Sequence, residues 1–132
     1  MPESLKIEIH QKINKITTLE DVESLQNELV DRFGINDDEL NLYMYEKLFY
    51  TLCTANDIEN VDIKPKLITL EMSFERSQKV NGEFIYRSAF ELSNNFLLSY
   101  HNQRIIINFK TGNYVNNSWL PLMCKYLNKI VN

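Results

Sequence analysis

The sequence predicts an α+β fold in which three N-terminal helices pack with a small antiparallel or mixed sheet of about four strands, one intervening helix and a C-terminal helix. Apolar residues recur at intervals of three and four over residues 3–54, which is the period of a helix, and the period changes after residue 55. The helices and strands are segregated along the chain and do not alternate as β–α–β units. With 132 residues, of which 44% are hydrophobic, the chain is long enough for one core and too short for two, so residues 1–132 are expected to form a single domain.

A first helix is predicted over residues 3–15, where Leu5, Ile9 and Ile13 recur at helical spacing. His10 lies beside this stripe, and because no second ligand or base is near it in the sequence, we expect a structural or surface histidine. The predicted helix begins almost at the first residue, with no lead-in. This suggests that the chain is a fragment of a longer protein.

The clearest helix signals lie between Thr18 and Gly34. Thr18 is a suitable N-cap, and Asp21 three residues later gives a weaker form of the capping box. Gly34 stands where a left-handed residue ends a helix at the lowest steric cost. Glu28 and Arg32 are one turn apart, in the order that favours a helical ion pair. The buried stripe of this helix is predicted to comprise Leu19, Val22, Leu25, Leu29 and Phe33.

Asp31 is the anomaly of this second helix. It sits in the last turn, where the carbonyl ends of the backbone disfavour a negative charge by roughly 0.3–1 kcal/mol. One explanation is a hydrogen bond from Asp31 to the following loop or to the next helix. The other explanation is a contact between Asp31 and the surface of another protein, and the sequence leaves both open.

A third helix is predicted from Asp37 to about Thr54, with Asn36 as its N-cap and acidic residues in its first turn. Its apolar residues lie on two faces, so we expect burial on two sides, between the first two helices and the sheet. Its tyrosines are expected to fill the core and interfaces and not to stack on nucleic-acid bases, since only Lys47 is close. The three adjacent carboxylates of residues 37–39 point in different directions on a helix, which favours a solvated cluster over a metal site.

The second half of the chain is predicted to form the sheet and two further helices. The alternation of apolar and polar residues over 67–74 is typical of a half-buried strand, and a short polar connection between two apolar runs is typical of a hairpin. The predicted elements are an irregular strand over 57–63, a strand over 67–74, a polar loop over 75–83, a helix over 84–96, hairpin strands over 97–100 and 104–109 around a tip at His101-Asn102-Gln103, and a last helix that is capped by Asn117 or Ser118 and carries Pro121 in its first turn.

The composition argues against several classes of function. The net charge is −4 and the basic residues are scattered, so the one-sided basic field that duplex DNA requires is not expected. The three glycines are isolated at positions 34, 82 and 112, which excludes a glycine-rich phosphate loop, and the two histidines fall on different predicted elements. Cys53 and Cys124 lack metal-type spacing and are expected to be buried, reduced thiols of a cytoplasmic protein. No apolar run in the sequence approaches the roughly 18 residues that a membrane-spanning helix needs. We therefore expect a domain with no catalytic residues, no metal or cofactor of its own and no membrane contact.

One motif is distinctive. Residues 28–34 read E-L-V-D-R-F-G, and a helix with apolar residues at positions 13, 16, 19 and 22 precedes them. This stretch resembles the signature of the C-terminal domain of bacterial transcription-repair coupling factor (Mfd), in which E-L-(I/V)-D-R-F-G is followed by an acidic helix start and a long apolar helix, as over residues 35–50. The resemblance covers nearly the whole chain in layout and is specific in motif from about residue 12 to residue 52. The family usually has a proline near the start of the third helix, and residues 36–38 replace it here.

The resemblance implies a parent protein that is a large, helicase-like, ATP-driven DNA translocase. Such a protein displaces RNA polymerase stalled at DNA damage and recruits UvrA for nucleotide excision repair. ATP, Mg²⁺ and DNA would bind to other parts of the parent. The C-terminal domain would be a non-catalytic regulatory domain that docks on the UvrB-like module, covers the UvrA-binding surface and so autoinhibits the protein until polymerase is engaged.

The resemblance also implies roles for individual residues. Glu28 and Asp31 would form the contact between the domain and the UvrB-like module. Arg32, Phe33 and Gly34 would serve the structure of the motif.

Three other hypotheses remain open from the sequence. A free-standing protein-interaction or oligomerisation module could use Tyr45 and Phe49 as a dimer seam. A nucleic-acid-binding domain would need a basic face. An enzyme with an acidic site between the second and third helices would need four carboxylates to converge in a cleft, namely those of Glu28, Asp31, Asp37 and Asp38.

Overall fold

The computed structural model describes residues 2–131, which form six helices and a four-stranded sheet. The strand order is β1-β2-β4-β3 and every neighbouring pair is antiparallel, so the predicted α+β class is confirmed and the sheet is antiparallel, not mixed. The elements are α1 (Glu3–Asn14), α2 (Leu19–Phe33), α3 (Asp38–Ala55), β1 (Ile58–Ile63), β2 (Leu67–Met72), α4 (Phe74–Lys79), α5 (Gly82–Leu92), β3 (Phe96–His101), β4 (Arg104–Lys110) and α6 (Leu120–Ile130).

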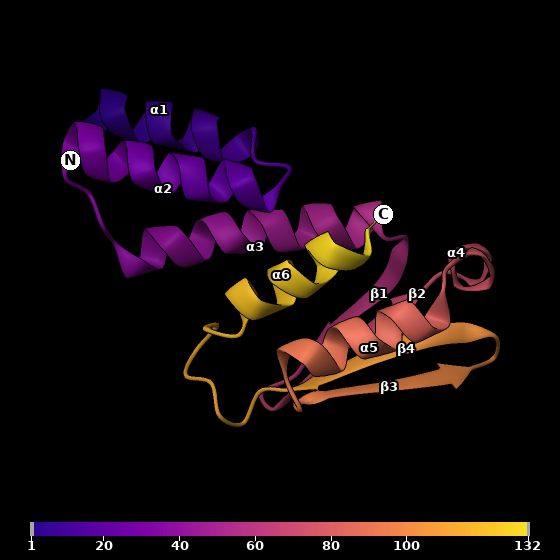
Figure 1. Cartoon of the computed structure of the whole chain (residues 1–132). Helices are drawn as coiled ribbons and strands as arrows, with labels where there is room; N and C mark the ends of the chain where they lie inside the picture. The colour runs from indigo at the N-terminus through magenta and orange to yellow at the C-terminus, as the bar shows by residue number, and fades with distance from the viewer. Residues whose placement is uncertain (1, 132) are drawn as a thin grey trace.

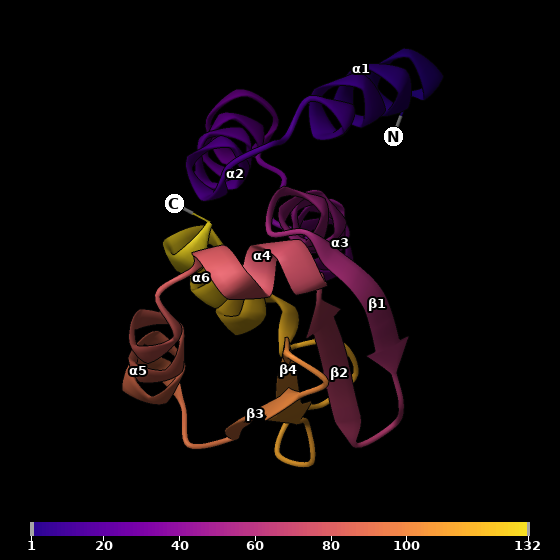
Figure 2. The same cartoon turned by 90° about the vertical axis from the view of Figure 1, so that its right-hand side faces the viewer.

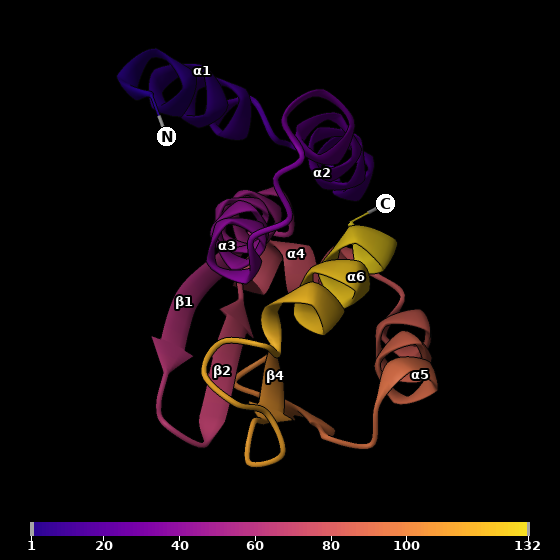
Figure 3. The ribbon, with the colours of Figure 1, turned by 90° about the vertical axis from the view of Figure 1, so that its left-hand side faces the viewer.

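The elements stack in layers (Figure 1). Helices α3, α6 and α5 lie side by side over one face of the sheet, and α1 and α2 lie on the outer side of α3 and α6, as the perpendicular view also shows (Figure 3). Helix α3 thus has α1 and α2 on one side and the sheet on the other, as its two apolar faces predicted. Helix α1 is the outermost element, and it lies beside α2 and against α3 (Figure 2).

The core joins all three layers. Tyr126 of α6 is fully buried and its hydroxyl donates to the carbonyl of Ile85 in α5 at 3.1 Å. Phe96 and Phe109 stack across the hairpin with their ring centroids 4.7 Å apart. From α3, the buried residues are Met44, Leu48, Phe49, Leu52 and Cys53.

Both cysteines lie in this core, at the contact between α3 and α6. Burial raises the pKa of the Cys53 thiol to about 12, and burial is also the main cause that raises the pKa of Cys124. The Cys124 thiol contacts the carbonyl of Tyr45 at 3.2 Å. Both residues are free thiols.

Helix α2 has the ends that its sequence predicted. The Thr18 hydroxyl accepts from the backbone N–H of Asp21 at 3.1 Å, and the Asp21 carboxylate accepts from the backbone N–H groups of Thr17 and Thr18 at 3.0 and 3.1 Å. These hydrogen bonds, led by that from Thr17, lower the pKa of Asp21. At the other end, Gly34 has a φ of 64° and closes the helix in the left-handed conformation. The capping box and the glycine stop are both confirmed.

Gly34→Ala is expected to lower the free energy of unfolding by about 1 kcal/mol, because an L-residue pays a steric cost in the left-handed region. A Cβ at Gly34 would meet no atom within 4 Å, so the whole effect arises in the backbone. Urea unfolding followed by circular dichroism would measure it. The matched control is Gly82→Ala at the start of α5, where an added Cβ would also meet no atom within 4 Å but the φ is not positive. This variant should be neutral or slightly stabilising. Equal losses for both variants would contradict the backbone explanation.

The N-cap of α3 is Asp37, and the prediction of Asn36 was wrong. The Asp37 carboxylate accepts from the N–H groups of Glu39 and Leu40 at 2.9 and 3.3 Å, while the Asn36 side chain accepts from Asn41 at 3.4 Å. Both residues can cap, and the charged carboxylate gains more at the positive end of a helix.

The segment predicted as a polar loop over 75–83 instead contains helix α4 and the start of α5. Ser73 caps α4 by accepting from the N–H of Arg76 at 3.0 Å, and so ends the preceding strand before Phe74. The buried Ser77 hydroxyl accepts from the N–H of Ile105, and Arg76 donates to the carbonyl of Val131. A six-residue helix shows little periodicity, and these long-range hydrogen bonds are not visible in the sequence.

The helix predicted over 84–96 is α5, which begins earlier and ends earlier. Asn81 caps it by accepting from Phe84 at 3.1 Å, and Phe96 belongs to β3. The predicted hairpin is confirmed. Its turn is only Asn102-Gln103, with φ values of 53° and 64°, and His101 is the last residue of β3, not part of the tip.

The last helix begins at Leu120 and is capped by neither Asn117 nor Ser118, so that prediction was wrong. The N-cap position is Trp119, whose side chain makes no capping hydrogen bond. Trp119 is buried and its ring meets Phe49 edge-on at 5.5 Å, so core packing sets where this helix starts. Pro121 lies in the first turn, as predicted.

Candidate docking surface

The E-L-V-D-R-F-G motif forms the last turns of α2 and its glycine stop (Figure 1). Successive residues of a helix are about 100° apart, which gives each motif side chain its own direction. Leu29 is buried and Phe33 is partly buried against the core. Glu28 faces α1, and Asp31 is exposed to solvent.

Glu28 is tied to two cations. Its Oε1 lies 3.0 Å from Arg32 Nη1 on the same helix and 3.2 Å from Lys12 Nζ on α1. The hydrogen bonds from Arg32 and then from Lys12 lower the pKa of Glu28. The pair with Arg32 is the one that the spacing predicted. The pair with Lys12 was not predicted, because it depends on the register between α1 and α2, for which the sequence carries no direct signal.

Arg32 connects Glu28 to a second carboxylate and to the motif phenylalanine. Its Nη1 is 3.7 Å from Glu8 Oε2 on α1, and its guanidinium carbon lies 4.7 Å from the centre of the Phe33 ring. Glu8, Lys12, Glu28 and Arg32 therefore form an ion network between α1 and α2 in which two positive and two negative charges balance. We call this set the α1–α2 ion network.

Asp31 is different from Glu28. Within residues 2–131 its carboxylate makes no hydrogen bond and no ion pair, and the side chain is exposed. The explanation that a hydrogen bond to the next loop or helix accounts for Asp31 therefore finds no support in the structure. Its negative charge remains uncompensated at a helix end that does not favour it.

The structure also bears on the rival sites. The hollow beside Glu28 has a volume of about 500 Å³ and is lined by Lys12, Lys15, Ile16, Asp21, Ser24, Leu25 and Glu28, so it does not gather Asp31, Asp37 and Asp38 with Glu28. Among residues 2–131, no cluster of three or more His, Cys, Asp or Glu side chains has the arrangement to hold a metal ion. The hypothesis of a dimer interface built on Tyr45 and Phe49 is wrong for Phe49, because the Phe49 ring is fully buried within the domain.

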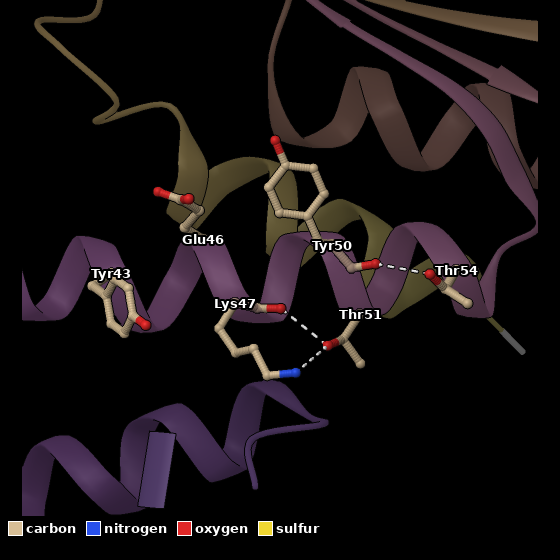
Figure 4. A pocket seen from close by; sticks show the side chains of 6 residues that line it. All are labelled: Tyr43, Glu46, Lys47, Tyr50, Thr51 and Thr54. Carbon is tan, nitrogen blue, oxygen red and sulfur yellow. Dashed lines mark hydrogen bonds between the residues drawn. The ribbon is translucent and has the colours of Figure 1, made fainter. Parts of the chain in front are cut away.

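A second hollow, of about 400 Å³, lies on a solvent-exposed face of α3 (Figure 4). Tyr43 and Tyr50 flank it, and both are nearly half exposed. Lys47 lies within 3.5 Å of the Thr51 hydroxyl, which itself donates to the Lys47 carbonyl at 3.0 Å. Its lining includes one carboxylate, that of Glu46, and no histidine or cysteine. Across residues 2–131, no helix combines the length and the apolar character needed to cross a membrane.

Comparison with known proteins identifies the class of this domain. Residues 2–84 match the family model described as the TRCF domain, and the chain belongs to that family. The match is to this domain and not to a catalytic ATPase domain.

The relatives name the protein in which such domains occur. The chain is 23% identical over 129 residues to the transcription-repair-coupling factors of Staphylococcus aureus strains USA300 and NCTC 8325, covering 98% of this chain and 11% of theirs. It thus spans about one-ninth of the length of those relatives. Its fold is similar to a crystal structure of the C-terminal domain of transcription-repair coupling factor, with a TM-score of 0.76, 20% identity, and coverage of 98% of this chain and 80% of that one. The resemblance predicted from residues 28–34 is confirmed.

Proposed function

We propose that this chain is the C-terminal regulatory domain of a transcription-repair coupling factor and that it docks on the UvrB-like module of its parent. Docked there, it masks the UvrA-binding surface and keeps the parent autoinhibited until RNA polymerase is engaged. The domain itself is non-catalytic. Contact with DNA, with ATP and with Mg²⁺ belongs to other domains of the parent, and the domain acts on UvrA and polymerase indirectly, in the cytoplasm.

The observation that carries the proposal is the exposed, unpaired carboxylate of Asp31, within residues 2–131, on a helix that is capped at both ends. A partner arginine would supply the compensation that the domain does not. Charge-assisted hydrogen bonds between carboxylates and guanidinium groups give specificity, and at a solvent-exposed rim they are weak enough to release. A modest, polar contact between domains is what a reversible switch requires. Glu28, one turn away, adds a second carboxylate to the same contact.

The test is the double variant Glu28→Ala and Asp31→Ala, measured by titration against a purified UvrB-like module of a coupling factor. Docking is expected to weaken by about 10-fold or more, because two charge-assisted contacts are lost. The melting temperature should change by no more than about 3 °C, since both groups lie at the surface and surface ion pairs contribute little.

Glu46→Ala is the matched control. Glu46 is an exposed carboxylate on α3 without an ion-pair partner in residues 2–131, so the control removes a similar charge from another surface. It should leave docking nearly unchanged. A large loss of thermal stability in the double variant would instead assign Glu28 and Asp31 to internal structure, and unchanged docking would rule out the proposed contact.

A further inference from the structure

The α1–α2 ion network has a consequence for the proposed contact, on which this inference rests. Glu28 Oε1 is held by Lys12 Nζ at 3.2 Å and by Arg32 Nη1 at 3.0 Å. Its side chain is only 30% exposed, in contrast to the exposed Asp31. A cation on a docking partner that approaches Glu28 therefore meets a carboxylate whose charge is already compensated.

The two cations differ in how easily they can leave. Arg32 is on the same helix as Glu28, shares its guanidinium with Glu8 and lies over the Phe33 ring, so it moves with the motif. Lys12 contacts Glu28 through one flexible ammonium group from a different helix. Lys12 is thus the cation that a partner's arginine can replace.

Helix α1 is also the least embedded of the helices around the motif. It lies at the outer edge of the domain, against α2 and α3 (Figures 1 and 2). Its buried residues are Ile9 and Ile13, while Ile7 is 53% exposed. A change in the ion network can occur there without disturbing the contact between α3 and α6.

We propose that α1 restrains docking by competing, through Lys12, for the carboxylate of Glu28. In the undocked domain, Asp31 presents its charge freely and Glu28 is occupied by α1. Docking exchanges the ammonium of Lys12 for a cation of the partner, so the strength of the pair between Lys12 and Glu28 sets the affinity. The partner that this arrangement fits has two basic side chains, one that meets Asp31 directly and one that displaces Lys12.

Lys12→Gln tests the inference, with titration against the UvrB-like module as the readout. Removing the competitor should tighten docking by about two- to five-fold, the range expected for a partly exposed ion pair. Lys6→Gln is the control, because Lys6 is an exposed lysine on the same helix with no ion-pair partner in residues 2–131. It removes the same charge, and it should change affinity by less than about 1.5-fold through screened, long-range attraction.

A third variant shows that the effect passes through Glu28. In the Glu28→Gln background, adding Lys12→Gln should give no further gain, because no carboxylate remains for Lys12 to occupy. The inference is overturned if Lys12→Gln binds no more tightly than Lys6→Gln, or if the gain persists without Glu28. If Asp31→Ala still weakens docking in that case, the proposed function stands and only the competition by α1 is ruled out. If the unmodified chain does not dock at all, both the proposed function and the competition by α1 are ruled out.

Discussion

Replacing Phe49 by alanine is expected to lower the free energy of unfolding by about 3–5 kcal/mol, because it removes a whole aromatic ring from the core. Phe49 is completely buried in α3, where its ring meets Trp119 at 5.5 Å. Alanine would leave a cavity between α3 and the start of α6. Chemical unfolding monitored by Trp119 fluorescence and by circular dichroism would give the change.

Tyr50→Ala is the matched control for this cavity. Tyr50 is the next residue on the helix and its ring contacts that of Phe49 at 5.0 Å, but it is 47% exposed. We expect a loss below about 1 kcal/mol for this variant. A loss at Phe49 as small as that expected at Tyr50 would show that Phe49 does not anchor the core.

Asn56→Ala is expected to lower the free energy of unfolding by about 2 kcal/mol, a smaller loss than that of Phe49→Ala and one with a different cause. Asn56 is fully buried at the end of α3, and its side-chain amide donates to the carbonyls of Leu52 and Leu127 at 2.9 and 3.1 Å. Alanine would leave the Leu127 carbonyl in α6 without this buried donor, and a buried unsatisfied group costs about 1–3 kcal/mol. Thermal and urea unfolding would measure the effect.

Asn41→Ala is the matched control for Asn56→Ala. Asn41 lies on the same helix and donates to Asn36 at 3.4 Å in an exposed position, so its loss should be within about 0.5 kcal/mol of neutral. If Asn56→Ala were equally neutral, the amide would not connect α3 to α6, and packing alone would hold the two helices together.

Most of the fold follows from patterns that lie within single segments. The stop at Gly34, the capping box at Thr18 and the presence of the hairpin each depend on neighbours a few positions apart, so the sequence predicts them directly. Helix α4 escaped prediction because it is short and is held by Ser77 and Arg76 through partners 28 and 55 residues away. The start of α6 was misplaced because Trp119 packs against α3, a contact that capping rules do not include.

Some features of the candidate site likewise follow from the sequence, and others needed the structure. The pair between Glu28 and Arg32 and the anomalous position of Asp31 follow from helix geometry alone. The exposure of Asp31 and the lack of an internal partner within residues 2–131 needed the structure. The ion pair between Lys12 and Glu28 could not be predicted from the sequence, because it depends on how α1 packs against α2.

The two buried thiols can report on the transient separation of α3 and α6. Cys53 and Cys124 are 3% and 0% exposed, and burial holds both in the unreactive protonated form. An alkylating reagent can reach them only when α3 and α6 separate. The rate of covalent labelling therefore follows the fraction of molecules in which this seam is transiently open, and the unmodified sequence needs no added probe for that measurement.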